Sequence, residues 1–295
     1  MEKRDFSILV SKFLPQVKKN VNLANFTTFK IGGESKFFLK VKTKKELIKA
    51  LLVAKRLKLP FFILGGGSNI LVSDEGFSGL VIKFGEPLSF YVNKGLDWAV
   101  GIPGTLQGAV YGNAGAFGFS MADFVKEVEV FDIQKEKIKI FKNKDCQFDY
   151  RESIFKKKKN LILLSVKLKT KKSNPQKRRE YLEYRKKNHP SLPSAGCIFK
   201  NIKISSLNKS LFEKFPVFSQ FKNEKFIPCA FLISECNLKG KRIGKVEISK
   251  KHPNFIVNLG GGKAKDVLKL INLIKKRVKE KFQIQLEEEI EYLGF

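Results

Sequence analysis

The chain has 295 residues and carries 58 Lys and Arg against 28 Asp and Glu, a formal net charge of +30. Its 43% hydrophobic content supports a buried core and excludes a disordered chain, and its length predicts roughly two domains. No run of about 20 apolar residues is present, so no membrane span is expected. The N-terminus is charged and lacks a cleavage-site pattern, so we expect a cytoplasmic protein without a signal peptide.

Cysteine and histidine are few and scattered, and no Cys-x-x-Cys pair occurs. A metal site built on histidine pairs or cysteine clusters is therefore not expected, nor is a disulfide framework. The residues concerned are Cys146, Cys197, Cys229, Cys236, His189 and His252.

The positive charge raises the question of a nucleic-acid partner. Lysine is spread along the chain, with its densest runs at 156–159, which we interpret as a loop, and 171–187, which predicts a solvated helix. No RNP, zinc-finger, KH or helix-turn-helix pattern accompanies these runs. An anionic small molecule, drawn by the positive field, explains the charge better than a nucleic acid does.

The first clear element is a helix over 43–59. Thr43 and Glu46 form a capping-box pattern, apolar residues recur on one face, and Pro60 ends the helix. Short apolar runs at 61–64, 70–72 and 80–82 predict buried strands. The chain therefore begins as a β-α-β arrangement with glycines at a strand end.

The later elements follow the same rules of periodicity. The 263–282 segment has an apolar stripe and predicts a long amphipathic helix, and the closing LEEEIEYLGF predicts a strand. The remaining expected elements are a helix near 230–236 and strands near 128–133, 137–141, 161–168, 242–248 and 254–258.

Two glycine-rich segments are candidate cofactor loops: GGGSN at 65–69 and GIPGTLQGAVYGNAGAFG at 101–118. Glycine lets backbone N–H groups approach a phosphate closely, so two such segments suggest a dinucleotide in a long cleft. A tight turn for the first segment and a close-packed small-residue helix for the second are the structural alternatives. The first segment matches neither a Rossmann nor a P-loop pattern.

Three polar features could carry chemistry. Arg151 in YRESIF can hold a carboxylate, or form a surface ion pair with Glu152. Cys197 in SAGCIFKN can donate a proton, or serve as a small buried apolar group. Alternate glutamates among 287–289 share a face of the predicted strand, and one facing Arg151 would be catalytic in character.

These segments, taken together, resemble the UDP-N-acetylenolpyruvoylglucosamine reductase (UDP-N-acetylmuramate dehydrogenase) family, in its short subclass without an extra substrate-covering loop. The matches span nearly the whole chain in the family's order. They are NFTTFKIGG (25–33), ILGGGSNILVSDEGFSGLVI (63–82), GIPGTLQGAVYGNAGAFG (101–118), YRESIFK (150–156), SAGCIFKN (194–201), LKGKRIG (238–244), HPNFIVN (252–258) and LEEEIEYLG (286–294).

The resemblance implies an α+β protein with a two-subdomain FAD-binding fold of the vanillyl-alcohol-oxidase type and a C-terminal α/β substrate domain. It places the first FAD subdomain at 1–83, with 287–295 returning to it. The second FAD subdomain is expected at 84–187 and the substrate domain at 188–286.

The resemblance also implies an NADPH-dependent flavoenzyme of peptidoglycan precursor synthesis, which reduces an enolpyruvyl UDP-sugar to UDP-N-acetylmuramate. Arg151 would hold the developing enolate, Cys197 would donate the proton in place of the usual serine, and Glu289 would assist. The expected protein is a monomer whose partner is the UDP-sugar, with neither nucleic acid nor membrane.

The implied binding residues fall into two groups. FAD would contact Gly65, Gly66, Gly67, Ser68, Asn69, Ile102, Pro103, Gly104, Thr105, Gly108, Asn113, Ala114, Gly115 and Gly118. The substrate would contact Tyr150, Lys200, Asn201 and Asn254. No residue is expected to bind a metal.

The chain departs from the family pattern in places. The stretch between Ile82 and Trp98 is short, and Ile202 and Asn188 replace a proline and a lysine. Two other functions remain open at this stage. One is a different FAD-dependent oxidoreductase of the same fold, and the other is a basic, non-catalytic nucleic-acid-binding protein, which would be colourless.

Overall fold

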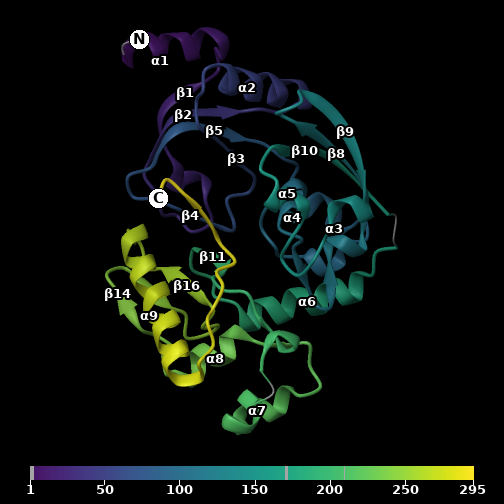
Figure 1. The fold of residues 1–295 in the computed structure, drawn as a ribbon, viewed down its shortest axis with the longest axis vertical. Coiled ribbons are helices and arrows are strands. Elements are labelled where there is room, and N and C mark those ends of the chain that lie inside the picture. Colours follow the sequence, from purple (N-terminus) through teal and green to yellow (C-terminus); the bar gives the residue numbers. More distant parts are fainter. Residues whose placement is uncertain (1–2, 170–171, 209) are drawn as a thin grey trace.

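The computed structural model describes residues 3–169, 172–208 and 210–295 (Figure 1). Two curved sheets form one side of the molecule, and a third sheet with its helices forms the other. No helix in these ranges combines the length and the apolar character that a bilayer crossing needs.

The first sheet has the strand order β1-β2-β5-β3. Its strands are β1 (Lys18–Asn22), β2 (Glu34–Lys40), β5 (Phe77–Lys83) and β3 (Phe61–Leu64), of which β2, β5 and β3 are parallel. Helices α1 (Lys3–Phe13) and α2 (Lys44–Arg56) lie on its outer side (Figure 1). Thr43 and Glu46 cap α2 as a reciprocal capping box, which confirms the predicted helix start.

The second sheet is antiparallel, in the order β10-β8-β9. Its strands are β8 (Val125–Asp132), β9 (Lys137–Lys142) and β10 (Leu161–Leu168). The short elements around it are α3 (Ser89–Val92), α4 (Leu106–Tyr111), β6 (Gly115–Ala116), β7 (Phe119–Ser120) and α5 (Ile154–Lys157). The lysine run at 156–159 is thus partly helical, because Ser153 caps α5, whereas the sequence indicated a loop.

The first two sheets share one core. Leu47 and Leu51 of α2 pack in the same buried cluster as Phe131 and Leu164 from the second sheet. A separate cluster, which includes Trp98 and Phe155, fills the space between the second sheet and the short helices.

The third sheet has the order β11-β16-β15-β14. It comprises β11 (Ser194–Cys197), β14 (Arg242–Ile243), β15 (Val246–Ile248) and β16 (Phe255–Asn258). The single strand expected over 242–248 is wrong: Gly244, at φ +54°, begins a two-residue turn that makes a hairpin. The same half contains α7 (Ser210–Lys214), α8 (Cys229–Glu235), α9 (Ala264–Phe282), β12 (Ile202–Lys203) and β13 (Phe226–Ile227).

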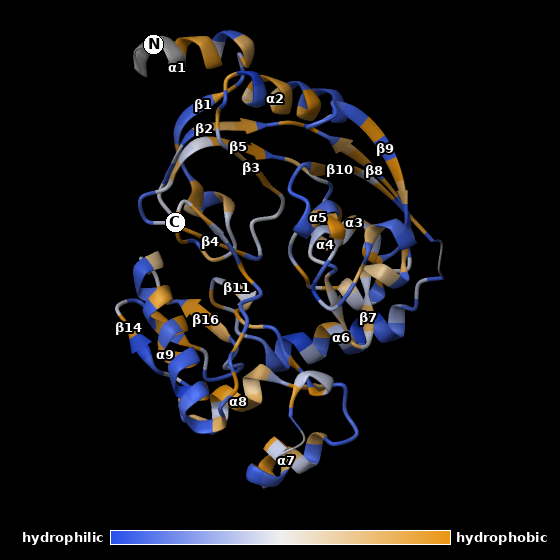
Figure 2. Cartoon of the chain, in the orientation of Figure 1, coloured by the Kyte–Doolittle hydropathy of each residue, from blue (hydrophilic) through white to orange (hydrophobic). Residues whose placement is uncertain are grey.

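Helix α9 confirms the predicted amphipathic helix, since its apolar stripe lies buried in the core of this half. Helix α6 (Pro175–Asn188) instead has no buried residue, as predicted for a solvated helix, and is largely hydrophilic in Figure 2.

The chain then returns to the first half: β17 (Glu291–Leu293) pairs in parallel with β4 (Ile70–Val72). The predicted closing strand is therefore shorter than expected, because residues 284–287 and 289–290 form no ladder.

Short 3-10 helices complete the connections. They are η1 (Leu23–Phe26), η2 (Asp97–Ala99), η3 (Met121–Asp123), η4 (Asn143–Cys146), η5 (Ile204–Ser206) and η6 (Pro216–Phe221).

Candidate active site

A cleft of about 2370 Å³ lies between the two halves of the molecule. Its walls come from segments far apart in the sequence, including both glycine loops, the end of α6, β11 and the 287–292 segment. Arg151, Cys197 and Glu289 all line it. The structure therefore brings the three expected catalytic residues to one cleft.

The first glycine loop follows β3 and is packed too tightly for side chains. A Cβ on Gly66 would lie 2.3 Å from Cα of Gly104, in the second glycine segment. Gly67 has φ +67°, and a Cβ there would lie 2.1 Å from the carbonyl oxygen of Phe26. Only glycine fits these positions, so the two loops touch through their backbones at the wall of the cleft.

The second glycine segment is a cleft wall in part and a packed helix in part. Pro103 and Gly104 line the cleft, while Leu106 and Val110 of α4 are buried. The packed-helix interpretation is therefore confirmed for α4, while the cleft lining leaves the cofactor-loop interpretation as a prediction. Of the residues expected to contact FAD, those that line the cleft are Gly65, Gly66, Gly67, Ser68, Asn69, Ile102, Pro103, Gly104, Thr105, Gly108, Ala114 and Gly115.

Two expected FAD residues do not line the cleft. The buried Asn113 amide donates to the carbonyl of Asp149 at 2.7 Å, and its oxygen accepts from the N–H of Ala122 at 3.0 Å. Gly118 lies in the connection between β6 and β7, at φ +80°. Asn113 holds neighbouring backbone in place, and Gly118 makes a turn.

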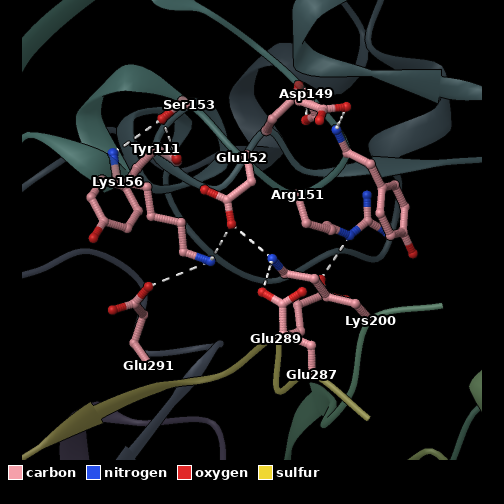
Figure 3. A network of polar contacts seen from close by, with 12 residues as sticks. Tyr111, Asp149, Arg151, Glu152, Ser153, Lys156, Lys200, Glu287, Glu289 and Glu291 are labelled. Carbon is pink, nitrogen blue, oxygen red and sulfur yellow. Dashed lines mark hydrogen bonds and ion pairs between the residues drawn. The ribbon is translucent and has the colours of Figure 1, made fainter. Parts of the chain in front are cut away.

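Arg151 is fixed by two partners. Its Nε donates to Oε1 of Glu289 at 2.7 Å, and one of its terminal nitrogens donates to the carbonyl of Gly115 at 2.8 Å (Figure 3). Its backbone is left-handed, with φ +56°, a strained conformation that is concentrated at functional sites. Its ion-pair partner is thus a glutamate 138 residues away and not the adjacent Glu152, which was the surface alternative.

The charges around Cys197 favour its protonated form. Burial, reinforced by the Glu289 carboxylate, raises the pKa of the Cys197 thiol to about 12, although Arg151 and Arg185 oppose this shift. Burial also raises the pKa of Glu289, against the pull of Arg151. For Arg151, burial lowers the pKa, but Glu289 and other neighbours outweigh it, so its pKa is raised. The cleft thus holds a permanent cation beside a neutral thiol.

The three consecutive glutamates point in alternating directions, even though only Glu288 makes a strand-like bridge there, to Phe199. Glu287 and Glu289 face Lys200 and Arg151, whereas Glu288 binds Lys275 at 2.8 Å on the other side. The expected alternation therefore holds for an extended segment that is not part of a sheet.

The 287–291 segment is bonded along both edges. On one edge, Glu289 N–H donates to the carbonyl of Ile198 at 2.7 Å, and Lys200 N–H donates to the carbonyl of Glu287 at 2.9 Å. On the other edge, the Asn69 amide donates to the carbonyl of Glu289 at 3.0 Å, and Glu291 N–H donates to the carbonyl of Asn69 at 2.9 Å. The segment therefore connects the first glycine loop with the chain that follows Cys197.

A series of ion pairs links the 287–291 segment to Glu152, Lys156 and Lys200 (Figure 3). We call this region, together with Arg151, the junction. Lys200 Nζ lies 2.7 Å from Glu152 and 2.5 Å from Glu287, and its side chain is only 9% exposed. Lys156 then links Glu152 to Glu291, at 4.0 and 3.6 Å. Lys200, which was expected to bind substrate, is therefore engaged with two carboxylates and does not line the cleft.

The other expected substrate residues are also held by the protein itself. The Tyr150 hydroxyl accepts from the N–H of Asn201 at 3.1 Å, and the Asn201 side chain accepts from the N–H of Cys229 at 3.1 Å. Asn254, which is 2% exposed, bonds both backbone groups of Phe199. None of these three lines the cleft, so in this structure they support its walls.

Sequence reasoning missed several cleft residues. Arg185 of α6 donates to the carbonyl of Trp98 at 3.2 Å and lies 5.1 Å from the ring of Phe117. Lys83, the last residue of β5, and His189 also line the cleft. The helix pattern around Arg185 indicated only solvation, and single cations at strand ends carry no recognisable sequence signal.

A glycine-lined cleft onto which a guanidinium, a carboxyl group and a thiol open is an arrangement that fits an oxidoreductase. Residues 187–293 match the model of the UDP-N-acetylenolpyruvoylglucosamine reductase C-terminal domain. A reductase of that name from Caldicellulosiruptor bescii is 36% identical over 94% of this chain and 90% of its own length. Another, from Borreliella burgdorferi, is 35% identical over 95% of each.

A solved structure agrees with these sequence relatives. The crystal structure of UDP-N-acetylenolpyruvylglucosamine reductase from Thermus caldophilus superimposes with a TM-score of 0.73 and 32% identity, covering 94% of this chain and 99% of that one. The chain belongs to the UDP-N-acetylenolpyruvoylglucosamine reductase family. The family expected from the motifs and the expected fold class are both confirmed.

Proposed function

We propose that this chain reduces the enolpyruvyl ether of UDP-N-acetylglucosamine to UDP-N-acetylmuramate with NADPH, a step of peptidoglycan precursor synthesis. The observation that carries the proposal is the meeting of Arg151, Glu289 and Cys197 in a glycine-lined cleft. These residues lie far apart in the sequence, and only the fold brings them together. Family membership supplies the substrate class.

The glycine loops fit an FAD cofactor. The contact between Gly66 and Gly104 leaves no room for a side chain, so peptide groups form the wall of the cleft at this point. Such a backbone surface suits a diphosphate, which needs N–H donors at close range. We propose that residues 65–69 hold the diphosphate and that 102–105, Gly108, Ala114 and Gly115 hold the rest of the cofactor. When bound, FAD supplies to the enolpyruvyl methylene carbon the hydride that it takes from NADPH.

Arg151 stabilises the negative charge that builds on the neighbouring carbon and its carboxylate. Because Glu289 and Gly115 already hold the guanidinium, it needs no reorientation when the charge appears. A preorganised donor of this kind is typically worth about 3–4 kcal/mol of transition-state stabilisation.

Cys197 then protonates that carbon. Its raised pKa keeps the thiol protonated before the reaction, and an enolate carbon is far more basic than a thiolate, so transfer is downhill. One hydride and one proton are added across the double bond, and a proton from solvent restores the thiol. Glu289, whose pKa is raised by burial, is suited to relay that proton.

The proposed division of the chain into domains rests on how the hydrophobic cores are shared. We propose that 1–83 with 287–295, and 84–187, hold FAD, and that 188–286 binds the sugar nucleotide. Most of the core around α8 and α9 comes from 188–286, although Phe29, Ile31 and Leu71 of the first part join it. The first two parts share a core through α2. Tyr150, Lys200, Asn201 and Asn254 are proposed to support the substrate wall from behind.

Anaerobic stopped-flow spectroscopy tests the function. NADPH should bleach the flavin absorbance of the purified protein, and the enolpyruvyl UDP-sugar should restore it. Cys197→Ser should complete both phases, because a hydroxyl also donates a proton. Cys197→Ala should complete only the first. A fast second phase in Cys197→Ala would exclude Cys197 as the donor, and a colourless protein with no affinity for FAD would exclude the whole proposal.

A further inference from the structure

Lys83 occupies an unusual position beside the first glycine loop. It is the last residue of β5, and in the parallel pairing of β5 with β3 it lies opposite Leu64, directly before Gly65. Its ammonium group donates to the carbonyl of Gly65, and its side chain lines the cleft. The amine is therefore held at the start of the loop.

The charge of Lys83 is not compensated by the protein. Among the described residues, no carboxylate forms an ion pair with it, although its side chain is half-buried. Burial lowers its pKa, and repulsion from the neighbouring Lys40 adds to the shift. A half-buried cation without a counter-charge is unfavourable in the free protein, so the site is prepared for an anion.

Lys83 is also the only charged side chain contributed to the cleft lining by the cradle, which we define as residues 61–70, 83–84 and 101–117. Every other cradle residue in the lining is apolar, glycine, an uncharged polar residue or tyrosine. Backbone N–H groups offer only partial charges to a phosphate, whereas a diphosphate carries formal negative charge. Lys83 supplies the formal positive charge of the cradle, whereas the other cations of the cleft lining, such as Lys30 and Arg185, lie on segments outside it.

We propose that Lys83 binds the diphosphate of the dinucleotide cofactor and moves from the Gly65 carbonyl to a phosphate oxygen on binding. This inference rests on the proposed function, since it assigns a residue to the cofactor of that reaction. It gives the loop a specificity determinant: flavins with phosphate gain affinity from Lys83, and flavins without phosphate do not.

Titration of the apoprotein with flavins, followed by flavin fluorescence, tests the assignment. Lys83→Met should weaken FAD binding about tenfold or more and leave the weaker binding of riboflavin, which has no phosphate, unchanged. Lys40→Met is the matched control, because Lys40 lies opposite Lys83 in the sheet but is exposed and outside the cleft lining. Its FAD affinity should equal that of the parent protein.

A salt titration distinguishes an electrostatic contact between Lys83 and the phosphate from a structural role of Lys83 in supporting the 65–69 loop. The dissociation constant of FAD should rise with salt more steeply in the parent than in Lys83→Met, because screening weakens an ammonium–phosphate contact. Lys83→Arg should restore most of the affinity and the steep salt dependence. Equal FAD affinity in Lys83→Met and the parent overturns the assignment, as does an equal loss of FAD and riboflavin. Failure of the parent itself to bind FAD overturns instead the proposed function.

Discussion

The two principal walls of the cleft are built differently. Where the two glycine loops meet, the cradle wall is formed by backbone, because Gly66 and Gly104 approach so closely that neither has room for a side chain. The opposite junction consists of side chains, namely Arg151, Glu289 and the ion pairs around Lys200. Under the proposed function, the first wall holds the cofactor and the second supplies the charged groups of the reaction. Mutations should therefore separate cofactor binding from catalysis.

The largest effect is expected at the junction. Arg151→Ala should lower the rate of substrate reduction by about 100- to 1000-fold, because a fixed cation at the developing charge is lost. The flavin content should stay close to that of the parent, because Arg151 bonds the cradle at the Gly115 carbonyl and not at the 65–69 loop proposed to hold the diphosphate. Turnover and bound flavin, measured on one preparation, check both statements. If flavin is lost together with activity, the two walls are not independent.

A smaller and opposite effect is expected at the cradle. Gly66→Ala should weaken FAD binding and destabilise the fold by about 1–3 kcal/mol, because the new methyl group overlaps the Gly104 backbone. Gly112→Ala is the control: its φ is −90° and its nearest contact would be at 3.8 Å. Fluorescence titration and thermal melting measure the two effects. Normal FAD affinity in Gly66→Ala would show that the loops separate without consequence.

The smallest effect concerns His189, which lines the cleft, and His252, whose ring centre lies 5.5 Å from that of His189. Burial, aided by Arg185, lowers the pKa of His189 to about 4, and burial also lowers that of His252. The unfolded chain takes up protons near pH 6.5, while the folded histidines stay neutral. Their stabilisation is therefore complete above about pH 6.5 and is lost as the pH falls toward about 4.

The melting midpoint should accordingly fall by about 2–4 °C between about pH 7 and about pH 5. His189→Asn should reduce this slope, because His189 and His252 are the only histidines of the chain. A parallel pH dependence in His189→Asn and the parent would remove His189 as a cause.

Local signals in the sequence predicted local structure well. The capping box at Thr43, the apolar stripe of α9 and the solvated α6 each depend on neighbours within a few residues. The glycines of 65–67 were recognisable for the same reason, since their conformation is required by backbone geometry.

One local feature was missed: a single strand over 242–248 was expected because alternating apolar residues conceal a turn at Gly244.

Contacts between distant segments were harder to predict. The family resemblance named Arg151 and Glu289, but only the fold pairs them across 138 residues. Lys83 was missed because a single cation at a strand end has no periodicity. Arg185 was missed because it lies in a basic helix whose pattern indicated only solvation.

The extended segment 287–291 has a mechanical consequence. It is hydrogen-bonded to Asn69 along one edge and to the Ile198–Lys200 backbone along the other, so a shift of one edge displaces the other. The conformation of the glycine loop at 65–69 and the position of the Glu289 carboxylate are therefore coupled through the main chain of residues 287–291.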